Sequence, residues 1–199
     1  MEINFILLAI TCYLIGSIPF AYIITKLFGF GDIRNIGSGN VGSTNVLRTG
    51  NRKLAFIVLL FDILKGFLPL IILKNYLSTS TAEIIVYSIA SLTIIGHLFP
   101  IWLKFKGGKG VATYIGYTLA IDYRFGLIFI FSWLLIALIK KFSSLASIIS
   151  LIILPLSMYV TQFNKDINLL LSLISITIII RHYSNILRLF NKTENKIKF

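Results

Sequence analysis

The sequence predicts an all-α, polytopic integral membrane protein with seven transmembrane helices. Of the 199 residues, 57% are hydrophobic and only 13% are charged, against roughly 25% charged residues in soluble domains. The hydrophobic residues gather in long runs between short polar segments, and a bilayer needs about 20 apolar residues per helix. No Pro/Gly/Ser-rich linker divides the chain, so we expect residues 1–199 to form a single transmembrane domain.

The first expected span is too long for a signal-peptide core, and no basic residue precedes it, so we expect it to be retained. The seven spans are Ile3–Thr25, Leu54–Leu73, Ile84–Ile101, Val111–Asp122, Phe125–Ile139, Phe142–Phe163 and Ile167–Ile180. The fourth, fifth and seventh are short, and five spans is the alternative. Pro19 and Pro155 are expected to kink otherwise continuous helices.

Basic residues are distributed unevenly between the two sides of this arrangement. Fifteen of the 19 Lys and Arg residues fall on one side, and the other side receives only Lys74, Arg124 and Lys165. The positive-inside rule then places the C-terminus in the cytoplasm and the N-terminus outside. The net charge of +12 would suggest nucleic-acid binding in a soluble protein. Here topology and anionic ligands explain it better, and we expect no nucleic acid partner.

Asp62 and Lys65 lie three residues apart inside the second span. An ionisable pair within a membrane is a candidate functional site. We favour a structural ion pair, because the two side chains neutralise each other.

A glycine-rich basic segment stands out from its apolar surroundings. Residues 96–110 read GHLFPIWLKFKGGKG. A glycine-rich turn can direct several backbone N–H groups at an oxyanion, and a lysine adds charge. The candidate phosphate contacts are Gly107, Gly108, Lys109 and Gly110. A Walker loop is excluded because no Ser or Thr follows Lys109, and a flexible basic loop at the membrane surface is the alternative. We favour a structural imidazole over a catalytic one for His97, which stays among the candidate substrate contacts.

A second polar segment runs from Ser38 to Arg48 and reads SGNVGSTNVLR. If it is helical from about Ser43, Asn45 lies three residues before Arg48 on one face. A guanidinium beside hydroxyl and amide groups suits phosphate recognition. The alternative is a capped loop in which Arg48 marks the inner end of the second span.

A third polar segment, residues 181–188, leaves the last span and reads RHYSNILR. His182 and Asn185 are three apart and share a face, which also carries two arginines. An amphipathic exit helix with snorkelling cations is the alternative. Ser144 and Ser147 follow a lysine pair, and they could cap a helix or donate to a phosphate.

Several catalytic patterns are missing from the sequence. The seven acidic residues form no metal-binding cluster in sequence, and no Gly-x-Ser-x-Gly elbow occurs. Neither histidine is followed by an acid four residues on, and the single cysteine, Cys12, lies in an apolar run without an activating partner. We therefore expect no metal, no cofactor and no covalent intermediate.

The three polar segments together resemble the bacterial membrane glycerol-3-phosphate acyltransferase family that uses acyl phosphate. The family patterns are Ser-x-Asn-x-Gly-x-Thr-Asn-x-x-Arg, met from Ser38 to Arg48; Gly-His-x-Phe-Pro with Phe-x-Gly-Gly-Lys-Gly, met within residues 96–110; and Arg-His-x-x-Asn-Ile-x-Arg-Leu, met from Arg181 to Leu189. The resemblance covers nearly the whole chain. Lys192 is a departure, because the family usually has Gly there, shortly before the acid that is here Glu194.

The resemblance implies acyl transfer from a fatty acyl phosphate to the sn-1 hydroxyl of glycerol 3-phosphate, giving lysophosphatidic acid and inorganic phosphate. The implied catalytic residues are His182, Asn185 and Lys109. The implied substrate-binding residues are Ser38, Asn45, Arg48, Gly107, Gly108, Gly110, Ser144, Ser147, His97 and Glu194.

The resemblance also implies a setting for this reaction. The expected partners are glycerol 3-phosphate, fatty acyl phosphate and membrane lipid, in the bacterial inner membrane with the active site facing the cytoplasm. We expect the three polar segments to converge on one cationic site. A transporter or flippase for an organophosphate anion is the alternative function.

Overall fold

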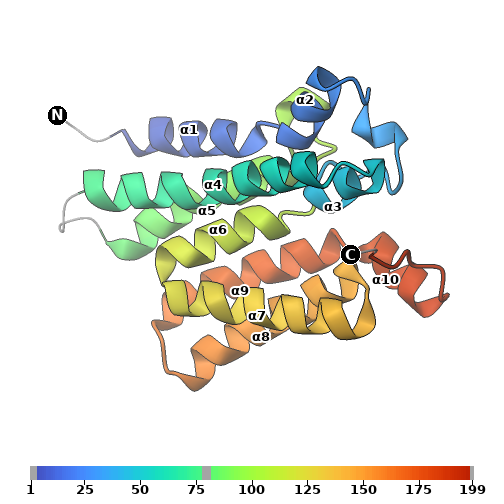
Figure 1. Ribbon diagram of the computed structural model, residues 1–199. Coiled ribbons are helices and arrows are strands. Elements are labelled where there is room, and N and C mark those ends of the chain that lie inside the picture. Colours follow the sequence, from blue (N-terminus) through green and yellow to red (C-terminus); the bar gives the residue numbers. More distant parts are fainter. Residues whose placement is uncertain (1–3, 78–81, 198–199) are drawn as a thin grey trace. The chain divides into compact units, whose positions relative to one another are not determined.

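All regular structure in the described part of the chain is helical (Figure 1). The computed structural model describes residues 4–77 and 82–197. The helices are α1 (Phe5–Ser17), α2 (Phe20–Leu27), α3 (Ser43–Val46), α4 (Arg52–Tyr76), α5 (Glu83–Leu98), α6 (Val111–Ile121), α7 (Tyr123–Lys140), α8 (Ser143–Val160), α9 (Lys165–Ile180) and α10 (Tyr183–Phe190), with 3-10 turns at Ile33–Asn35, Leu47–Thr49 and Ile101–Leu103.

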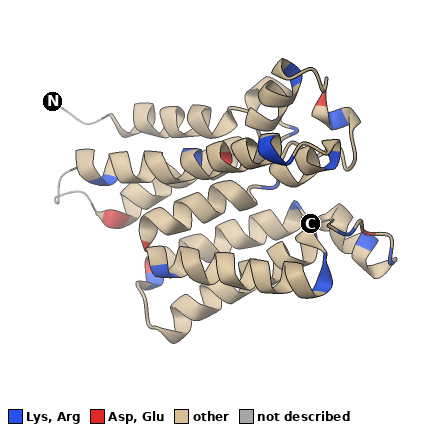
Figure 2. Ribbon diagram, in the orientation of Figure 1, with Lys and Arg blue, Asp and Glu red and all other residues tan. Residues whose placement is uncertain are grey.

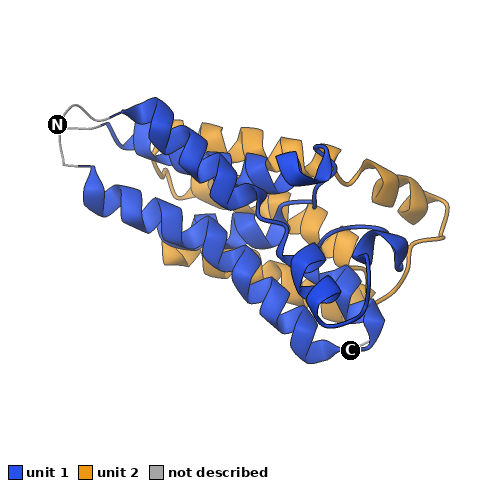
Figure 3. Cartoon of the chain, turned by 90° about the horizontal axis from the view of Figure 1, so that it is seen from above, with its two compact units in different colours: residues 1–120 blue, residues 121–199 orange. Residues whose placement is uncertain are grey.

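The chain groups into two compact units, residues 1–120 and residues 121–199 (Figure 3). The first two polar segments belong to unit 1 and the third belongs to unit 2. Each unit is therefore described by itself. That the whole chain is a single domain stays a prediction.

The apolar helices confirm an all-α membrane protein. Within the described residues, four helical stretches are long and apolar enough to cross a bilayer, or up to six if each bent pair, α1 with α2 and α9 with α10, is one span. α6 is apolar but shorter. The count of seven and the orientation of the termini stay predictions. Ile3, the expected start of the first span, and Lys198 lie outside the described residues.

The expectation of a continuous helix is wrong at Pro19 and right at Pro155, where the kink stays a prediction. α1 ends at Ser17, and α2 begins at Phe20 and is bent by 42° from it. Proline lacks an N–H and keeps the residue before it out of helical backbone, and Ile18 is extended, with φ −61° and ψ 116°. Pro155, by contrast, lies inside the unbroken α8.

Glycines bring the helices of unit 1 together without intervening side chains. A methyl group on Gly16 of α1 would overlap the backbone of Thr93 in α5, and one on Gly96 of α5 would overlap the backbone of Tyr13 in α1. Gly116 of α6 approaches the backbone of α4 in the same way. Helices in lipid associate through such close packing, because the hydrophobic effect does not drive one apolar helix against another when lipid tails are equally apolar.

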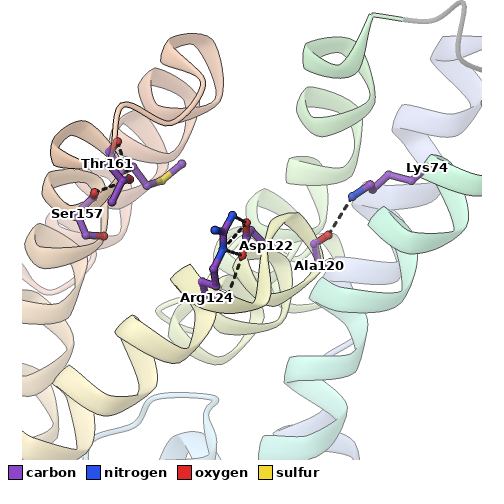
Figure 4. A network of polar contacts seen from close by, with 7 residues as sticks. Lys74, Ala120, Asp122, Arg124, Ser157 and Thr161 are labelled. Carbon is purple, nitrogen blue, oxygen red and sulfur yellow. Dashed lines mark hydrogen bonds and ion pairs between the residues drawn. The ribbon is translucent and has the colours of Figure 1, made fainter.

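Charged residues lie mainly at helix ends and in connecting loops (Figure 2). Asp122 accepts from the backbone N–H of Arg124 at the start of α7 and pairs with its guanidinium at 2.5 Å, and Lys74 of α4 donates to the carbonyl of Ala120 at 3.4 Å (Figure 4). Thr161 donates to a carbonyl one turn earlier in α8 (Figure 4). Two of the three basic residues expected on the outer side therefore have partners within their own unit.

Candidate functional site

The polar segment 38–48 of unit 1 is organised by the side chain of Asn45, which is 1% exposed. Its Nδ2 donates to the carbonyls of Ile33 (3.1 Å) and Ile36 (2.8 Å). Its Oδ1 accepts from the backbone N–H (2.9 Å) and the hydroxyl (3.2 Å) of Ser38. A buried amide that uses both ends in this way fixes the loop. Asn45 therefore holds the exposed Ser38 in place.

Asn45 and Arg48 lie one helical turn apart, although the helix between them changes type. α3 ends at Val46 and continues as the 3-10 turn Leu47–Thr49, in which residues three apart lie on one side. Both side chains meet at Gly37, which has φ +58°; a methyl group there would lie 2.8 Å from Arg48 Cδ and 2.5 Å from Asn45 Oδ1. The Arg48 side chain thus lies over a glycine and stays largely exposed.

The glycine-rich segment folds back from the end of α5 to the start of α6. Lys104 and Phe105 reverse the chain with φ of 52° and 62°. The N–H of Gly108 then donates to the carbonyl of His97 at 3.1 Å. Gly110, with φ +85°, is the last residue before α6. The glycines and Lys109 are therefore at a helix N-terminus, where backbone N–H groups and the helix dipole favour an anion.

The glycines of this segment pack directly on His97. A methyl group on Gly108 would overlap the imidazole at Nε2, and one on Gly107 would overlap the His97 carbonyl and Pro100. Any larger side chain at either position would lift the segment off α5. We call residues 107–110 the glycine loop below.

A buried charged cluster lies behind His97. Lys65 Nζ is 2.8 Å from Asp62 Oδ1, and His97 Nδ1 is 3.6 Å from the same oxygen. The exposed fractions are 2% for Asp62, 4% for Lys65 and 8% for His97. The predicted ion pair between Asp62 and Lys65 is confirmed. Its association with His97 was not predicted, because the sequence holds no signal that α4 and α5 meet at these positions.

In unit 2, Glu194 accepts three side-chain hydrogen bonds. Its Oε1 accepts from Ser144 Oγ (2.7 Å) and Asn185 Nδ2 (2.6 Å), and its Oε2 accepts from Arg188 Nε (2.7 Å). Burial alone would raise the pKa of Glu194, but the bonds from these three residues and the charge of Arg188 hold it below its usual value of 4.5. Glu194 is therefore ionised at neutral pH and joins α8 to α10.

The turn before Glu194 keeps a left-handed backbone although it lacks the expected glycine. Lys192 has φ +58°, a conformation that glycine adopts without steric cost and other residues adopt at roughly 1–2 kcal/mol. The three bonds to Glu194 hold the chain in this conformation. The departure at Lys192 therefore leaves the turn intact.

The two remaining candidates of unit 2 have defined hydrogen bonds. His182 Nδ1 lies 2.8 Å from the carbonyl of Ile178. A carbonyl can only accept, so Nδ1 carries a proton, and the lone pair of the imidazole is on Nε2 when the ring holds one proton. Ser147 donates its one hydroxyl proton to the carbonyl of Ser143 (2.9 Å) and accepts from Trp133 Nε1 (3.0 Å). In this conformation it has no proton for a substrate phosphate.

Comparisons with known proteins assign the family. The family described as glycerol-3-phosphate acyltransferase matches residues 6–192. The chain belongs to this family. The glycerol-3-phosphate acyltransferase of Pelagibacter ubique is 45% identical over 98% of both chains, and that of Bartonella quintana is 45% identical over 93% of this chain and 88% of its own. The resemblance inferred from the three polar segments is thus confirmed.

A solved structure supports the same assignment for this acyltransferase. The crystal structure of PlsY, an integral membrane glycerol 3-phosphate acyltransferase in its glycerol 3-phosphate form, gives a TM-score of 0.90 at 37% identity, covering 98% of this chain and 96% of that one. Its lysophosphatidic acid form gives 0.88 at 36% identity. The acyltransferase is therefore an integral membrane protein with the fold of that enzyme.

The structure of the acyltransferase brings its predicted site residues into two groups. In unit 1 they are Ser38 with Asn45 and Arg48, and His97 with Gly107, Gly108, Lys109 and Gly110; in unit 2 they are Ser144, Asn185 and Glu194, with His182 and Ser147 near the same helix ends. The catalytic and binding roles of these residues, and their convergence on one site, stay predictions. Among residues 4–77 and 82–197, no three His, Cys, Asp or Glu residues are arranged to hold a metal ion.

Proposed function

We propose that this chain transfers a fatty acyl group from acyl phosphate to the sn-1 hydroxyl of glycerol 3-phosphate. The products are lysophosphatidic acid and inorganic phosphate. Family membership supports the acyl transfer, and the names of the solved relatives include glycerol 3-phosphate and lysophosphatidic acid. The acyl phosphate donor is what the resemblance implies, and a phosphate site in the glycine loop is compatible with it.

The observation that carries the proposal is the glycine loop at the N-terminus of α6. Lys109 is in the loop, Gly110 precedes the helix, and the N–H of Tyr114 closes the first helical turn on the Gly110 carbonyl at 2.8 Å. N–H groups at a helix N-terminus together with a lysine form a phosphate site. Acyl phosphate offers such a phosphate beside the carbonyl that reacts. We propose that this loop binds it.

The reaction then needs positioning and charge stabilisation more than a covalent intermediate. The sn-1 oxygen attacks the acyl carbonyl carbon, the bond from that carbon to the phosphate oxygen breaks, and inorganic phosphate leaves. Lys109 and the loop amides stabilise the negative charge that develops on the leaving phosphate. No metal or cofactor enters this scheme.

The hydroxyl proton has two chemically competent acceptors. One is Nε2 of His182, whose lone pair follows from the bond between Nδ1 and the Ile178 carbonyl. The other is the phosphate of glycerol 3-phosphate itself. In either case we propose that His182 and Asn185 orient the reacting groups, and that Glu194 holds Asn185 for this task.

Binding of glycerol 3-phosphate is assigned to the exposed cationic and hydroxyl groups. Arg48 offers a guanidinium that is largely exposed, and Ser38 offers a hydroxyl fixed by Asn45. Ser144 of unit 2 donates its hydroxyl proton to Glu194 at 2.7 Å, so in this conformation it has no proton for the phosphate, like Ser147. The excess of Lys and Arg on one side supports an active site at the cytoplasmic face of the bacterial inner membrane.

The test is phosphate release by the purified protein in detergent. We expect phosphate release only when acyl phosphate and glycerol 3-phosphate are both present, unchanged by EDTA, and no lysophosphatidic acid when an acyl thioester replaces acyl phosphate. Formation of lysophosphatidic acid from the thioester would refute the donor. Binding of glycerol 3-phosphate without release would refute the enzyme and favour transport.

Two variants of one segment separate the phosphate site from general positive charge. Lys109→Ala should lower kcat/KM at least about tenfold, since a charge-assisted hydrogen bond contributes roughly 1.5–3 kcal/mol. Lys106→Ala removes the same charge from an exposed position three residues earlier and should change kcat/KM less than about threefold. Equal losses in the two variants would contradict a specific role for Lys109.

A further inference from the structure

We propose that Asp62 is a positioning residue for the phosphate-binding glycine loop and acts through His97. This proposal deepens the proposed function and rests on it. Asp62 lies inside α4, in an apolar helix, and is 2% exposed. Its ion-pair partners are Lys65 and His97, and neither belongs to the glycine loop. Any influence of Asp62 on the loop therefore passes through the His97 imidazole.

The first step of the argument is the contact between Asp62 and His97. Nδ1 of His97 is 3.6 Å from Asp62 Oδ1, which Lys65 also approaches at 2.8 Å as an ion pair rather than as an aligned hydrogen bond. A cavity of about 10 Å³ adjoins all three side chains and Val41 of the polar segment, roughly the space that one water molecule needs. Direct attraction or a bridging water therefore fixes the direction in which Nδ1 points.

The second step is the contact between His97 and the glycine loop. The imidazole edge opposite Nδ1 lies so close to Gly108 that a methyl group there would overlap Nε2. The backbone carbonyl of His97 also accepts from the N–H of Gly108 at 3.1 Å. One residue therefore holds Gly108 by both its backbone and its side chain. If the imidazole rotates, Gly108 loses this packing contact, and the position of Lys109 next to it is no longer fixed.

The third step is the cost of keeping Asp62 where it is. A buried ion pair seldom adds stability over apolar residues of similar volume. Lys65 is also bonded to the Ile18 carbonyl at 3.0 Å, so it has a structural role of its own. Asp62 has none beyond Lys65 and His97 among its described contacts. Its acceptor oxygen toward His97 is the feature that an apolar pair could not replace.

The test compares two double variants, only one of which keeps that oxygen. Asp62→Asn with Lys65→Met removes both charges and keeps a side-chain oxygen for His97. Asp62→Leu with Lys65→Met removes both charges and the oxygen, and leucine has the same number and branching of heavy atoms as asparagine. Both leave the membrane helix without an unpaired charge, so we expect their unfolding midpoints in detergent to agree.

The readout is competitive inhibition by inorganic phosphate, measured with kcat and the KM of acyl phosphate. We expect the Asn double variant to keep the inhibition constant within about threefold of wild type. The Leu double variant should raise it about tenfold, the effect of one lost polar contact of moderate strength. Equal inhibition constants in two variants of equal stability would overturn the proposal.

The proposal stays testable if the Leu double variant does not fold. His97→Asn keeps a polar atom near the position of Nδ1 for Asp62 and removes the ring edge against Gly108. We expect weaker phosphate inhibition, by about tenfold, with a native unfolding midpoint, and unchanged inhibition would refute the proposal. If the wild-type protein shows no turnover that requires both substrates, the proposed function is wrong. If the wild-type protein turns over both substrates and the variants have the same phosphate inhibition constant, only the role of Asp62 is wrong.

Discussion

Replacing Glu194 by Gln should loosen unit 2 by a predictable amount. Glutamine keeps one oxygen, which can still accept from Ser144 and Asn185, but turns an N–H toward Arg188 Nε. The charge-assisted bond to Arg188, 2.7 Å long, is lost. Such a bond contributes roughly 1.5–3 kcal/mol. The Arg188 side chain is 37% exposed, and water compensates part of the loss. We therefore expect a destabilisation of about 1.5 kcal/mol, close to tenfold in the unfolding equilibrium.

The protein carries its own probe for this measurement. Trp133 donates to Ser147 at 3.0 Å within unit 2, one helical turn from the serine that Glu194 holds. The other tryptophan, Trp102, is 61% exposed in unit 1 and can be replaced by Phe. Denaturant titration in detergent, followed by Trp133 fluorescence, then reports on unit 2 alone.

Asp166→Asn is the matched control for this variant. It also replaces a carboxylate by an amide, at an exposed acid in the first turn of α9 within unit 2, and should shift the midpoint by less than about 0.5 kcal/mol. A Glu194→Gln variant with the stability of the Asp166→Asn variant would refute the role assigned to the carboxylate.

Three further predictions concern the loops. The stabilisation by the Glu194 carboxylate is fully present above its usual pKa of 4.5 and is lost as the pH falls through its lower pKa in the folded state. The difference in unfolding free energy between wild type and Glu194→Gln should therefore narrow below pH 4.5. A difference that widens on acidification would contradict the lowered pKa. Lys192→Gly removes a left-handed lysine but adds backbone entropy to the unfolded chain, so unfolding should become more costly by about 0–1 kcal/mol at unchanged kcat/KM; clear destabilisation would contradict the strain. Gly108→Ala should raise the KM of acyl phosphate at least about tenfold, because the added methyl group meets the His97 imidazole. An unchanged KM would contradict the close packing of Gly108 on His97.

The sequence predicts most of the helices because hydrophobic length is a direct requirement of the bilayer. The span expected at Ile167–Ile180 corresponds to α9 (Lys165–Ile180), and that expected at Phe125–Ile139 to α7 (Tyr123–Lys140). The family follows from the three polar segments for a related reason. Glycine and cations at fixed spacing are rare in an apolar chain, so they carry information about function rather than packing.

What the sequence does not predict are the contacts between distant segments. Pro19 looks like Pro155 in hydropathy, yet one breaks a span and the other does not, because the neighbouring helices decide which freed carbonyls find donors. Asn45 lies on the expected side with Arg48, but its bonds to the carbonyls of Ile33 and Ile36, which close the loop, were not predicted. The link from Asp62 to His97 depends on how α4 and α5 meet, and periodicity within one helix holds no such information.

The break in the first span has a consequence for assembly in the membrane. The carbonyl of Ile18 lies at the break and accepts from two donors: the nearby backbone N–H of Phe20 at 3.1 Å and Nζ of Lys65 at 3.0 Å, which comes 47 residues later in the chain. Pro19 and the Phe20 N–H set the bend locally, and Lys65 adds a second bond once α4 has entered the bilayer. The bond ties the break to α4, and a chain truncated before Lys65 should keep its bend and lose only this tie.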